Sequence, residues 1–208
     1  MTEHPLITLI FVILNLIIFF NFTFLSKLLN IYDTPDFKRK IHSSNVAVFG
    51  GAILYINLCL VALIKIIQPD INFFETNIIN SNRNFVSFFA ISTAIYFIGL
   101  YDDKFGIRAT KKLFICAMVF LVSLQINPDF QVEIIKLSFY DDTIFLHDFS
   151  LVFTIICFLL LINALNMFDG INLQVGLYSL IVFIFFYLYN ISDLFSVIMI
   201  LALLLFLL

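Results

Sequence analysis

Long apolar runs without charged residues are the strongest constraint on how this chain can fold. Short polar loops separate these runs. Each run is apolar on all sides, whereas a helix of a soluble protein would keep a polar face at helical spacing. A helix that spans a bilayer needs about 20 mostly apolar residues, so the fourth and seventh runs are short. The seven candidate spans are residues 5–26, 41–64, 84–101, 113–128, 149–168, 170–192 and 194–208.

The composition agrees with a membrane protein. Hydrophobic residues make up 62% of the chain and charged residues 12%, whereas soluble domains average about 45–50% and about 25%. One buried core cannot hold this excess of apolar side chains, so the bilayer must cover the rest. We therefore expect an all-α fold, a polytopic membrane helix bundle with about seven spans that forms one domain over residues 1–208.

The basic residues indicate how the bundle is oriented. Eight of the eleven Lys and Arg residues lie in the first and third loops, and the residues before the first run contain none. Positively charged loops stay in the cytoplasm, so we expect these loops inside and the N-terminus outside. The fourth loop would then be outside, where alternating residues at 131–134 and 143–147 predict a short β-hairpin. The eight residues are Lys27, Lys38, Arg39, Lys40, Lys104, Arg108, Lys111 and Lys112.

Three polar clusters fall on the predicted cytoplasmic side. The first holds Arg39, Lys40 and His42, and Gly50 and Gly51 follow it. An alternative is that its cations only set the orientation of the chain in the membrane and attract anionic lipids. The paired glycines allow close packing of helices or would cradle a phosphate.

Two adjacent carboxylates, Asp102 and Asp103, end the third run beside Lys104. Their mutual repulsion requires a cation, either a nearby lysine or a divalent metal. Mg²⁺ binds through one or two carboxylates together with substrate phosphates. A solvated acidic helix end is the alternative. Neighbouring positions on a helix point about 100° apart, so we expect different roles for the two carboxylates.

A polar stripe ends the fifth run. Asn163, Asn166 and Asp169 share one helix face through their spacing, and Gly170 lets the helix end. Such groups are costly in a membrane unless they face a cavity or a partner, although they also hold helices together. Cations, carboxylates and amides on one membrane surface suit phosphoryl transfer, in which positioning and charge neutralisation dominate. The sequence has no Walker-type glycine-rich loop, so it does not indicate that the protein uses ATP.

The clusters resemble the motifs of a known family, the polyprenyl-phosphate N-acetylhexosamine-1-phosphate transferases of bacterial glycosyltransferase family 4. The chain is similar to the undecaprenyl-phosphate GlcNAc-1-phosphate transferases within it. Family members transfer a sugar 1-phosphate from a UDP-sugar to a membrane polyprenyl phosphate and release UMP, with Mg²⁺. The matching residues are Asp33, Pro35, Arg39, Lys40, His42, Gly50 and Gly51 in the first motif, Gly99, Asp102, Asp103 and Lys112 in the second, and Asn163, Asn166, Asp169 and Gly170 in the third.

The resemblance implies roles for these residues. The expected catalytic groups are Asp102 and Asp103, either of which would deprotonate or orient the polyprenyl phosphate. Asn166 would be a metal ligand, with Mg²⁺ expected and Mn²⁺ left open. The residues expected to bind the substrates are Lys112, Asp169, Asn163, Arg39, Lys40 and His42.

The resemblance also implies partners and a location. The partners are a UDP-sugar, a polyprenyl phosphate lipid and the inner (plasma) membrane, which the chain would cross several times. Nucleic acid is not among them, and a homodimer is left open. The product would initiate the synthesis of a cell-surface glycan, such as lipopolysaccharide or a cell-wall polymer.

Departures from the family pattern affect the fit of the substrates. Asn45 and Ala47 stand where prolines are usual, and Cys116 replaces a common glutamine. A later Gly-Asp-x-Gly-Ser motif and a later His-rich loop have no match, and the chain ends within an apolar run, so we expect a fragment of a longer product. A truncated, catalytically inactive membrane protein and a small transporter or channel are the alternative functions.

Overall fold

A computed structural model describes most of the chain, and its packing divides the chain into two compact units. The first unit comprises Met1–Asn80 and Phe168–Leu208, and the second comprises Ser81–Met167. The single domain expected over residues 1–208 stays a prediction. The described residues are 5–21, 24, 32–33, 46–47, 50–74, 79, 81–139, 142–168, 174–189 and 193–207.

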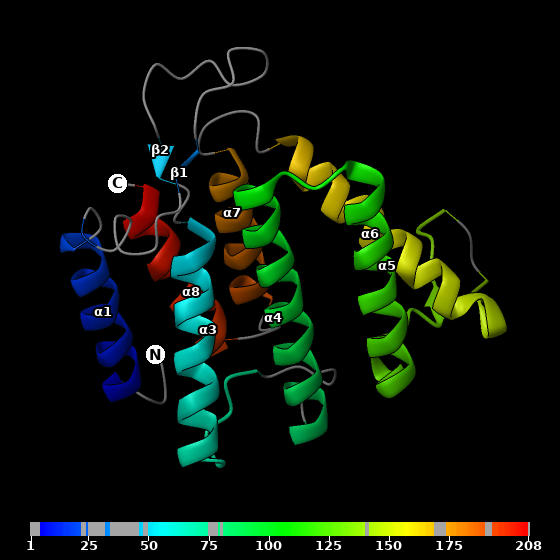
Figure 1. The fold of residues 1–208 in the computed structure, drawn as a ribbon. Coiled ribbons are helices and arrows are strands. Elements are labelled where there is room, and N and C mark those ends of the chain that lie inside the picture. Colours follow the sequence, from blue (N-terminus) through cyan, green and yellow to red (C-terminus); the bar gives the residue numbers. More distant parts are fainter. Residues whose placement is uncertain are drawn as a thin grey trace. The chain divides into compact units, whose positions relative to one another are not determined.

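Each of the predicted apolar runs contains a helix (Figure 1). In the described part of the chain, four helices are long and apolar enough to cross a membrane, namely α3, α4, α5 and α6 with its preceding turn. The shorter apolar helices α1, α7 and α8 have 16, 15 and 15 residues. The predicted helical membrane bundle is thus confirmed. The helices are α1 (Pro5–Phe20), α3 (Gly50–Ile67), α4 (Asn82–Phe105), α5 (Ala109–Ile126), α6 (Ser150–Phe168), α7 (Gln174–Leu188) and α8 (Asp193–Leu207).

The second span begins later than the sequence predicted. Its uncharged run starts at residue 41, but α3 starts at Gly50. Before it, the strand β2 (Val46–Ala47) pairs antiparallel with β1 (Tyr32–Asp33). The absence of charge shows where a chain can enter a membrane, but backbone pairing decides where the helix starts. The prediction did not include this strand pair.

Charged residues also mark helix ends poorly. The fourth span was predicted to be short, but α5 begins at Ala109 and includes Lys112 in its first turn. At the other end of α3, Lys65 lies inside the helix, and its Nζ donates to the carbonyls of Pro69 at 2.6 Å and Ile71 at 2.9 Å. A lysine can lie along a helix and still bring its ammonium group to polar partners, so a lysine does not end a spanning helix.

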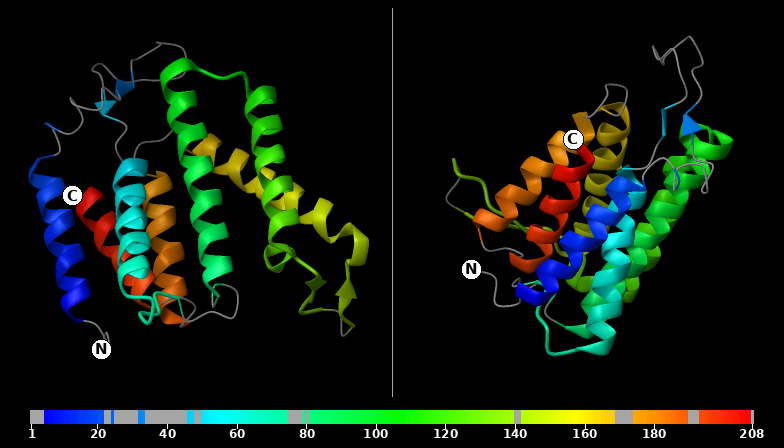
Figure 2. Two further views of the ribbon diagram at one scale, coloured as in Figure 1. Left: turned by 60° about the horizontal axis from the view of Figure 1, so that its bottom comes forward. Right: turned by 90° about the vertical axis from the view of Figure 1, so that its left-hand side faces the viewer.

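In the first unit, α8 is the central helix. It packs against α1, α3 and α7, as the two views of Figure 2 show. Its Ile198 and Ala202 are buried, as are Phe11 of α1 and Val61 of α3. The backbone N–H of Phe195, in the first turn of α8, donates to the carbonyl of Phe73 at 3.1 Å. This bond satisfies one of the N–H groups that a helix start leaves without a partner in the helix.

A buried pair of amides joins α1 to α3 in the first unit. Asn15 and Asn57 each donate to the side-chain oxygen of the other at 2.9 Å. Each also donates to a carbonyl of its own helix one turn earlier, at 2.8 and 2.9 Å. These polar groups, which would be costly in an apolar interior, therefore satisfy one another.

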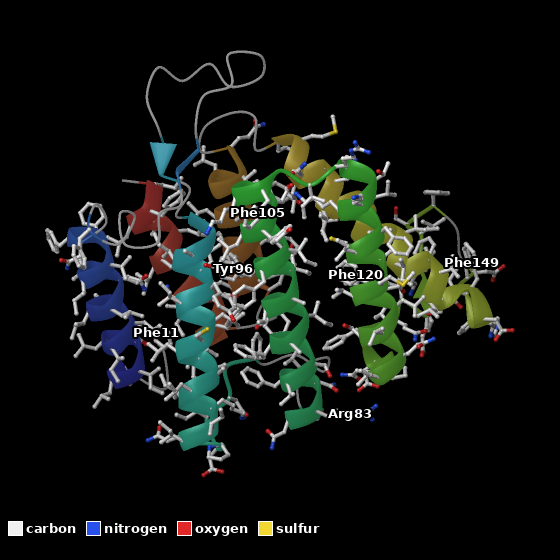
Figure 3. The ribbon with its side chains drawn as sticks, viewed as in Figure 1. Phe11, Arg83, Tyr96, Phe105, Phe120 and Phe149 are labelled. Carbon is white, nitrogen blue, oxygen red and sulfur yellow. The ribbon has the colours of Figure 1, made fainter. Side chains whose placement is uncertain are left out.

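In the second unit, α4 and α5 are neighbouring antiparallel helices. Ser81 caps the start of α4, since its hydroxyl accepts from the N–H of Asn84 at 3.1 Å. Figure 3 shows Arg83 and Phe105 at opposite ends of this helix. The rings of Phe120 in α5 and Phe158 in α6 stack with their centroids 4.4 Å apart, which fixes α6 against α5.

The predicted β-hairpin between α5 and α6 is present. β3 (Ile134–Ile135) pairs antiparallel with β4 (Ile144–Phe145), with Ile134 opposite Phe145. Short 3₁₀ helices flank the hairpin, η1 (Pro128–Phe130) after α5 and η2 (His147–Phe149) before α6. His147 has a φ of 45°, a left-handed conformation that histidine adopts more readily than most residues. That turn redirects the chain from β4 into α6.

Candidate active site

Three of the predicted site residues meet in the second unit. The Nζ of Lys112 lies 2.6 Å from the Oδ2 of Asp102 and 3.0 Å from the Oδ1 of Asn166. Asp102 lies in the last turns of α4, Lys112 in the first turn of α5 and Asn166 in the last turn of α6. Figure 1 shows these three helix ends together at one end of the unit. The structure thus brings residues from the second and third sequence motifs into contact.

The turn after α4 holds Asp102 in place. Its Oδ1 accepts from the N–H of Ile107 at 2.8 Å, and its carbonyl accepts from the N–H of Gly106 at 2.7 Å. Gly106 has a φ of 65°, which glycine adopts without steric cost. Neither turn residue was predicted from the sequence, although a glycine shortly after a helix is a recognised signal for such a turn.

The ion pair of Lys112 and Asp102 is partly withdrawn from water. The two side chains are 17% and 20% exposed, so solvent screens their attraction less than it screens a surface pair. Cys116 lies one turn farther along α5 than Lys112 and is buried. The thiol at the position of the common glutamine therefore packs inside the unit.

The two adjacent carboxylates differ in their surroundings, as their helical positions predicted. Asp102 is half-buried in the ion pair, whereas Asp103 is exposed at the same helix end. In the polar stripe of α6, Asn163 is also exposed, one turn before Asn166. Among the described members of the stripe, Asn166 is the one that Lys112 contacts.

Several predicted site residues lie outside the described residues. They belong to the first motif and to the end of the third. Of these segments the structure describes the backbone of Asp33 in β1 and the helix that begins at Gly50. The predicted residues outside the described parts are Arg39, Lys40, His42 and Asp169, with Pro35 and Gly170 of the same motifs.

The paired glycines of the first motif differ in their surroundings. A Cβ on Gly50 would lie 2.7 Å from the ring of Phe206 in α8, whereas a Cβ on Gly51 would meet nothing within 4 Å. Gly50 therefore permits the close approach of an aromatic ring, which is the packing role considered from the sequence. A role in phosphate binding stays a prediction.

Three exposed cations lie close to the ion pair in the chain. Lys104, Arg108 and Lys111 are exposed on the last turn of α4, on the connecting turn and on the first turn of α5. The Nζ of Lys104 lies 5.6 Å from the centroid of the Phe105 ring, within the range of a cation–π contact. Such a cluster of positive charge attracts anions toward the helix ends.

The oxygen atoms at this site suit a magnesium ion. Asp102 and Asp103 supply carboxylate oxygens and Asn166 an amide oxygen, the ligand types that Mg²⁺ prefers. Two of these oxygens already hold a cation, the ammonium group of Lys112. Among the described residues, no group of three His, Cys, Asp and Glu side chains could hold a metal. A Mg²⁺ site that also uses substrate phosphates needs only one or two carboxylates, so the residues present fit this ion.

Comparison with known families identifies the family of this chain. The family model of glycosyl transferase family 4 matches residues 85–208, which is more than half of the chain. The matched segment contains the second and third motifs and begins after the first. No curated protein and no solved structure matches the chain. The chain therefore belongs to glycosyl transferase family 4, and it is a multi-pass membrane transferase that acts in the transfer of a sugar phosphate to a polyprenyl phosphate.

Proposed function

We propose that this protein transfers an N-acetylhexosamine 1-phosphate from a UDP-sugar to a polyprenyl phosphate, such as undecaprenyl phosphate, and releases UMP. The product would be the first lipid-linked intermediate of a cell-surface glycan, such as lipopolysaccharide or a cell-wall polymer. The position of Lys112, whose ammonium group joins Asp102 to Asn166 at a helix end, carries this proposal. There a soluble nucleotide can reach the site from water while a long lipid stays in the bilayer.

The reaction joins one phosphate to another. A terminal oxygen of the polyprenyl phosphate forms a bond to the phosphorus that carries the sugar. The bond between that phosphorus and the bridging oxygen of the UDP-sugar breaks, and the bridging oxygen leaves as part of UMP. Both reactants are anions, so positioned cationic groups must offset their repulsion.

Lys112 would supply a positioned cation. An ammonium group has three N–H donors, of which Asp102 and Asn166 accept two. Among the described residues, the third has no acceptor, and a phosphate oxygen would take it. Because the ion pair with Asp102 holds the ammonium group before the substrates arrive, little reorganisation is needed when they bind.

The two carboxylates would have different roles. Both side-chain oxygens of Asp102 accept hydrogen bonds, one from Lys112 and one from Ile107, so Asp102 is a positioning residue for the lysine. Asp103 is exposed at the same helix end and would orient or deprotonate the polyprenyl phosphate. The exposure of Asp103 favours it as the carboxylate that meets the substrate.

Asn166 would be a ligand of Mg²⁺, or of Mn²⁺ in its place, together with the phosphates of the donor. When bound, the metal supplies positive charge that offsets the charge of the phosphates. The contact with Lys112 would hold the amide of Asn166 in place for this role. Removal of divalent metal should stop the transfer.

The remaining predicted residues complete the proposal. Asp169 would contact the nucleotide, and Arg39, Lys40 and His42 would bind the lipid phosphate or support the fold. The basic turn between α4 and α5 would face the cytoplasm, since positively charged loops stay on that side of the inner membrane. The UDP-sugar would therefore enter from the cytoplasm.

Transfer of radioactive label tests this function. Membranes that contain the protein receive labelled UDP-GlcNAc or UDP-GalNAc, undecaprenyl phosphate and Mg²⁺, and the label in the lipid fraction is measured. We expect labelled lipid, none after chelation of the metal, and a rate about 100-fold lower for Asp103→Asn. Lys136→Gln changes an exposed lysine beside β3 and should keep full activity. Absence of labelled lipid with both donors, or equal transfer by Asp103→Asn, would overturn the proposal.

A further inference from the structure

The β3–β4 hairpin has large apolar side chains on its surface. Phe139 is 85% exposed and Phe145 is 56% exposed, and Ile134 and Ile144 are exposed beside them. A group of exposed apolar side chains marks a contact with a membrane or with another protein. The position of the hairpin relative to the spanning helices distinguishes these two partners.

Hydrogen bonds tie the base of the hairpin to α6. The backbone N–H of Val132 donates to the Oγ1 of Thr154 at 2.9 Å, and the Oγ of Ser150 donates to the carbonyl of Val132 at 2.8 Å. Both Thr154 and Ser150 are buried. On the other side, the Nε2 of Gln131 donates to the carbonyl of Leu124 in α5 at 3.1 Å. The base of the hairpin is therefore fixed against both helices.

These contacts set the depth of the hairpin. Counted from His147, where the candidate span begins, Ser150 lies about 4 Å and Thr154 about 10 Å along the helix axis. The span His147–Phe168 has 22 residues, which extends about 33 Å and so crosses a hydrocarbon core of about 30 Å. Val132, which is bonded to Ser150 and Thr154, therefore lies beside the first turns of this span, and β3 begins two residues later. The strands thus lie near the end of α6 at which the span begins.

The apolar surface of the hairpin continues an exposed apolar side of α6. Phe149, Val152, Ile156 and Leu160 are exposed, and their spacing puts them on one side of the helix. Figure 3 labels Phe149 at the start of this row. In Figure 2, the hairpin lies beside the first turns of α6, at the end of α5 opposite the turn that follows α4. The apolar surface thus runs from the span into the hairpin.

We propose that the β3–β4 hairpin is an interfacial membrane anchor that inserts Phe139 and Phe145 into the boundary between phospholipid headgroups and acyl chains. Segments that lie at this boundary bury Phe, Trp and Leu side chains about 5–10 Å deep. The exposed Glu133 and Asp142 stay in water. The anchor sets the depth of α5 and α6 in the bilayer, and Lys112 lies at the other end of α5. This inference requires a membrane protein but no particular sugar donor.

The chain contains no tryptophan, so a single introduced tryptophan reports only its own surroundings. The test uses Phe139→Trp and Phe145→Trp in the full chain, reconstituted into phosphatidylcholine vesicles. Asp142→Trp, on the exposed loop of the same hairpin, is the matched control for water, and Leu160→Trp is the control for the bilayer interior. Phe139 is so exposed that its replacement removes no packing. Fluorescence is quenched with aqueous iodide and with lipids brominated either near the headgroup or near the end of the acyl chain.

We expect the emission of Phe139→Trp and Phe145→Trp to lie at shorter wavelength than that of Asp142→Trp. Shallow bromines should quench both at least about twofold more than deep bromines do, with the reverse order for Leu160→Trp. Iodide quenching of both as strong as that of Asp142→Trp would place the hairpin in water and overturn the proposal. Emission at short wavelength that neither iodide nor brominated lipid quenches would also overturn it, because a protein partner would then cover the patch.

Discussion

Lys112 of α5 and Asp102 of α4 form an ion pair with 2.6 Å between Nζ and Oδ2, and their side chains are 17% and 20% exposed. Removal of either partner would leave the other charge partly buried and without compensation, which costs more than loss of a surface pair. The same pair holds the ammonium group against Asn166. Stability and catalysis thus depend on the same contact, and matched variants can separate the two effects.

Replacement of Lys112 tests the positioned cation. We expect Lys112→Met to lower the rate of transfer about 100-fold, because the developing phosphate charge loses a donor. Lys112→Arg should retain part of the activity, since it keeps the charge but not the compact ammonium geometry. Lys136→Met, at an exposed lysine beside β3, is the matched control and should leave the rate unchanged. The measurement is labelled lipid formed per amount of protein, and an unchanged rate for Lys112→Met would contradict the assigned role.

Asn substitutions at the two carboxylates should affect different properties. Asp102→Asn weakens the ion pair, so we expect the free energy of unfolding in detergent to fall by about 1–3 kcal/mol. Asp103→Asn changes an exposed side chain and should lower that free energy less than Asp102→Asn does, while the rate of transfer falls. Denaturant titration and the transfer assay measure the two properties. Equal losses of stability in the two variants would argue against a positioning role for Asp102.

The effects of replacing Lys112 and Asp102 on the free energy of unfolding should also be coupled. We expect the double variant Asp102→Asn with Lys112→Met to be more stable than the sum of the single effects predicts, by about 1–2 kcal/mol, because its members share one interaction. A denaturant titration of the four proteins completes this double-mutant cycle. Additive effects would mean that the ion pair does not stabilise the helix ends.

Replacement of Gly106 tests whether the turn after α4 needs a residue that adopts a positive φ without strain. A Cβ at this residue meets nothing within 4 Å, but its φ is 65°, so Gly106→Ala should destabilise the protein through backbone strain alone, by about 1–2 kcal/mol. Gly51→Ala is the matched control, because its added Cβ also meets nothing within 4 Å and its backbone is helical. That change should be neutral or stabilise by up to about 0.5 kcal/mol. Thermal unfolding in detergent compares the two, and similar effects would contradict the assigned strain.

We also expect an energetic coupling between Asn15 and Asn57, the amide pair of the first unit. Asn15→Leu alone leaves the amide of Asn57 without its partner across the helices, and we expect a loss of about 1–2 kcal/mol. Asn57→Leu should cost a similar amount, and the double variant should cost less than the sum. Unfolding in sodium dodecyl sulfate can measure all three. A double variant that loses the full sum would show that the two amides act separately.

Local patterns predicted the helices well and their ends less well. The length of an uncharged apolar run is a property of one segment, so the helix within each run was predictable. The start of α3 follows β2, which lies in the same uncharged run, and the partner strand β1 lies on the far side of the basic residues 38–40, so the pattern of charge did not show this pairing. The start of α5 was missed because Lys112 belongs to the helix and reaches its partners through a long side chain.

The sequence alone determined that the chain enters a membrane, the order of its helices, the hairpin between α5 and α6, and the polar groups that form the candidate site. Each of these follows from residues close together in the chain. The tertiary structure decided which carboxylate meets Lys112. The sequence predicted that Asp102 and Asp103 differ but not which of them pairs with the lysine. The turn at Gly106 and the packing of α4 beside α5 bring Asp102 to the lysine and leave Asp103 exposed.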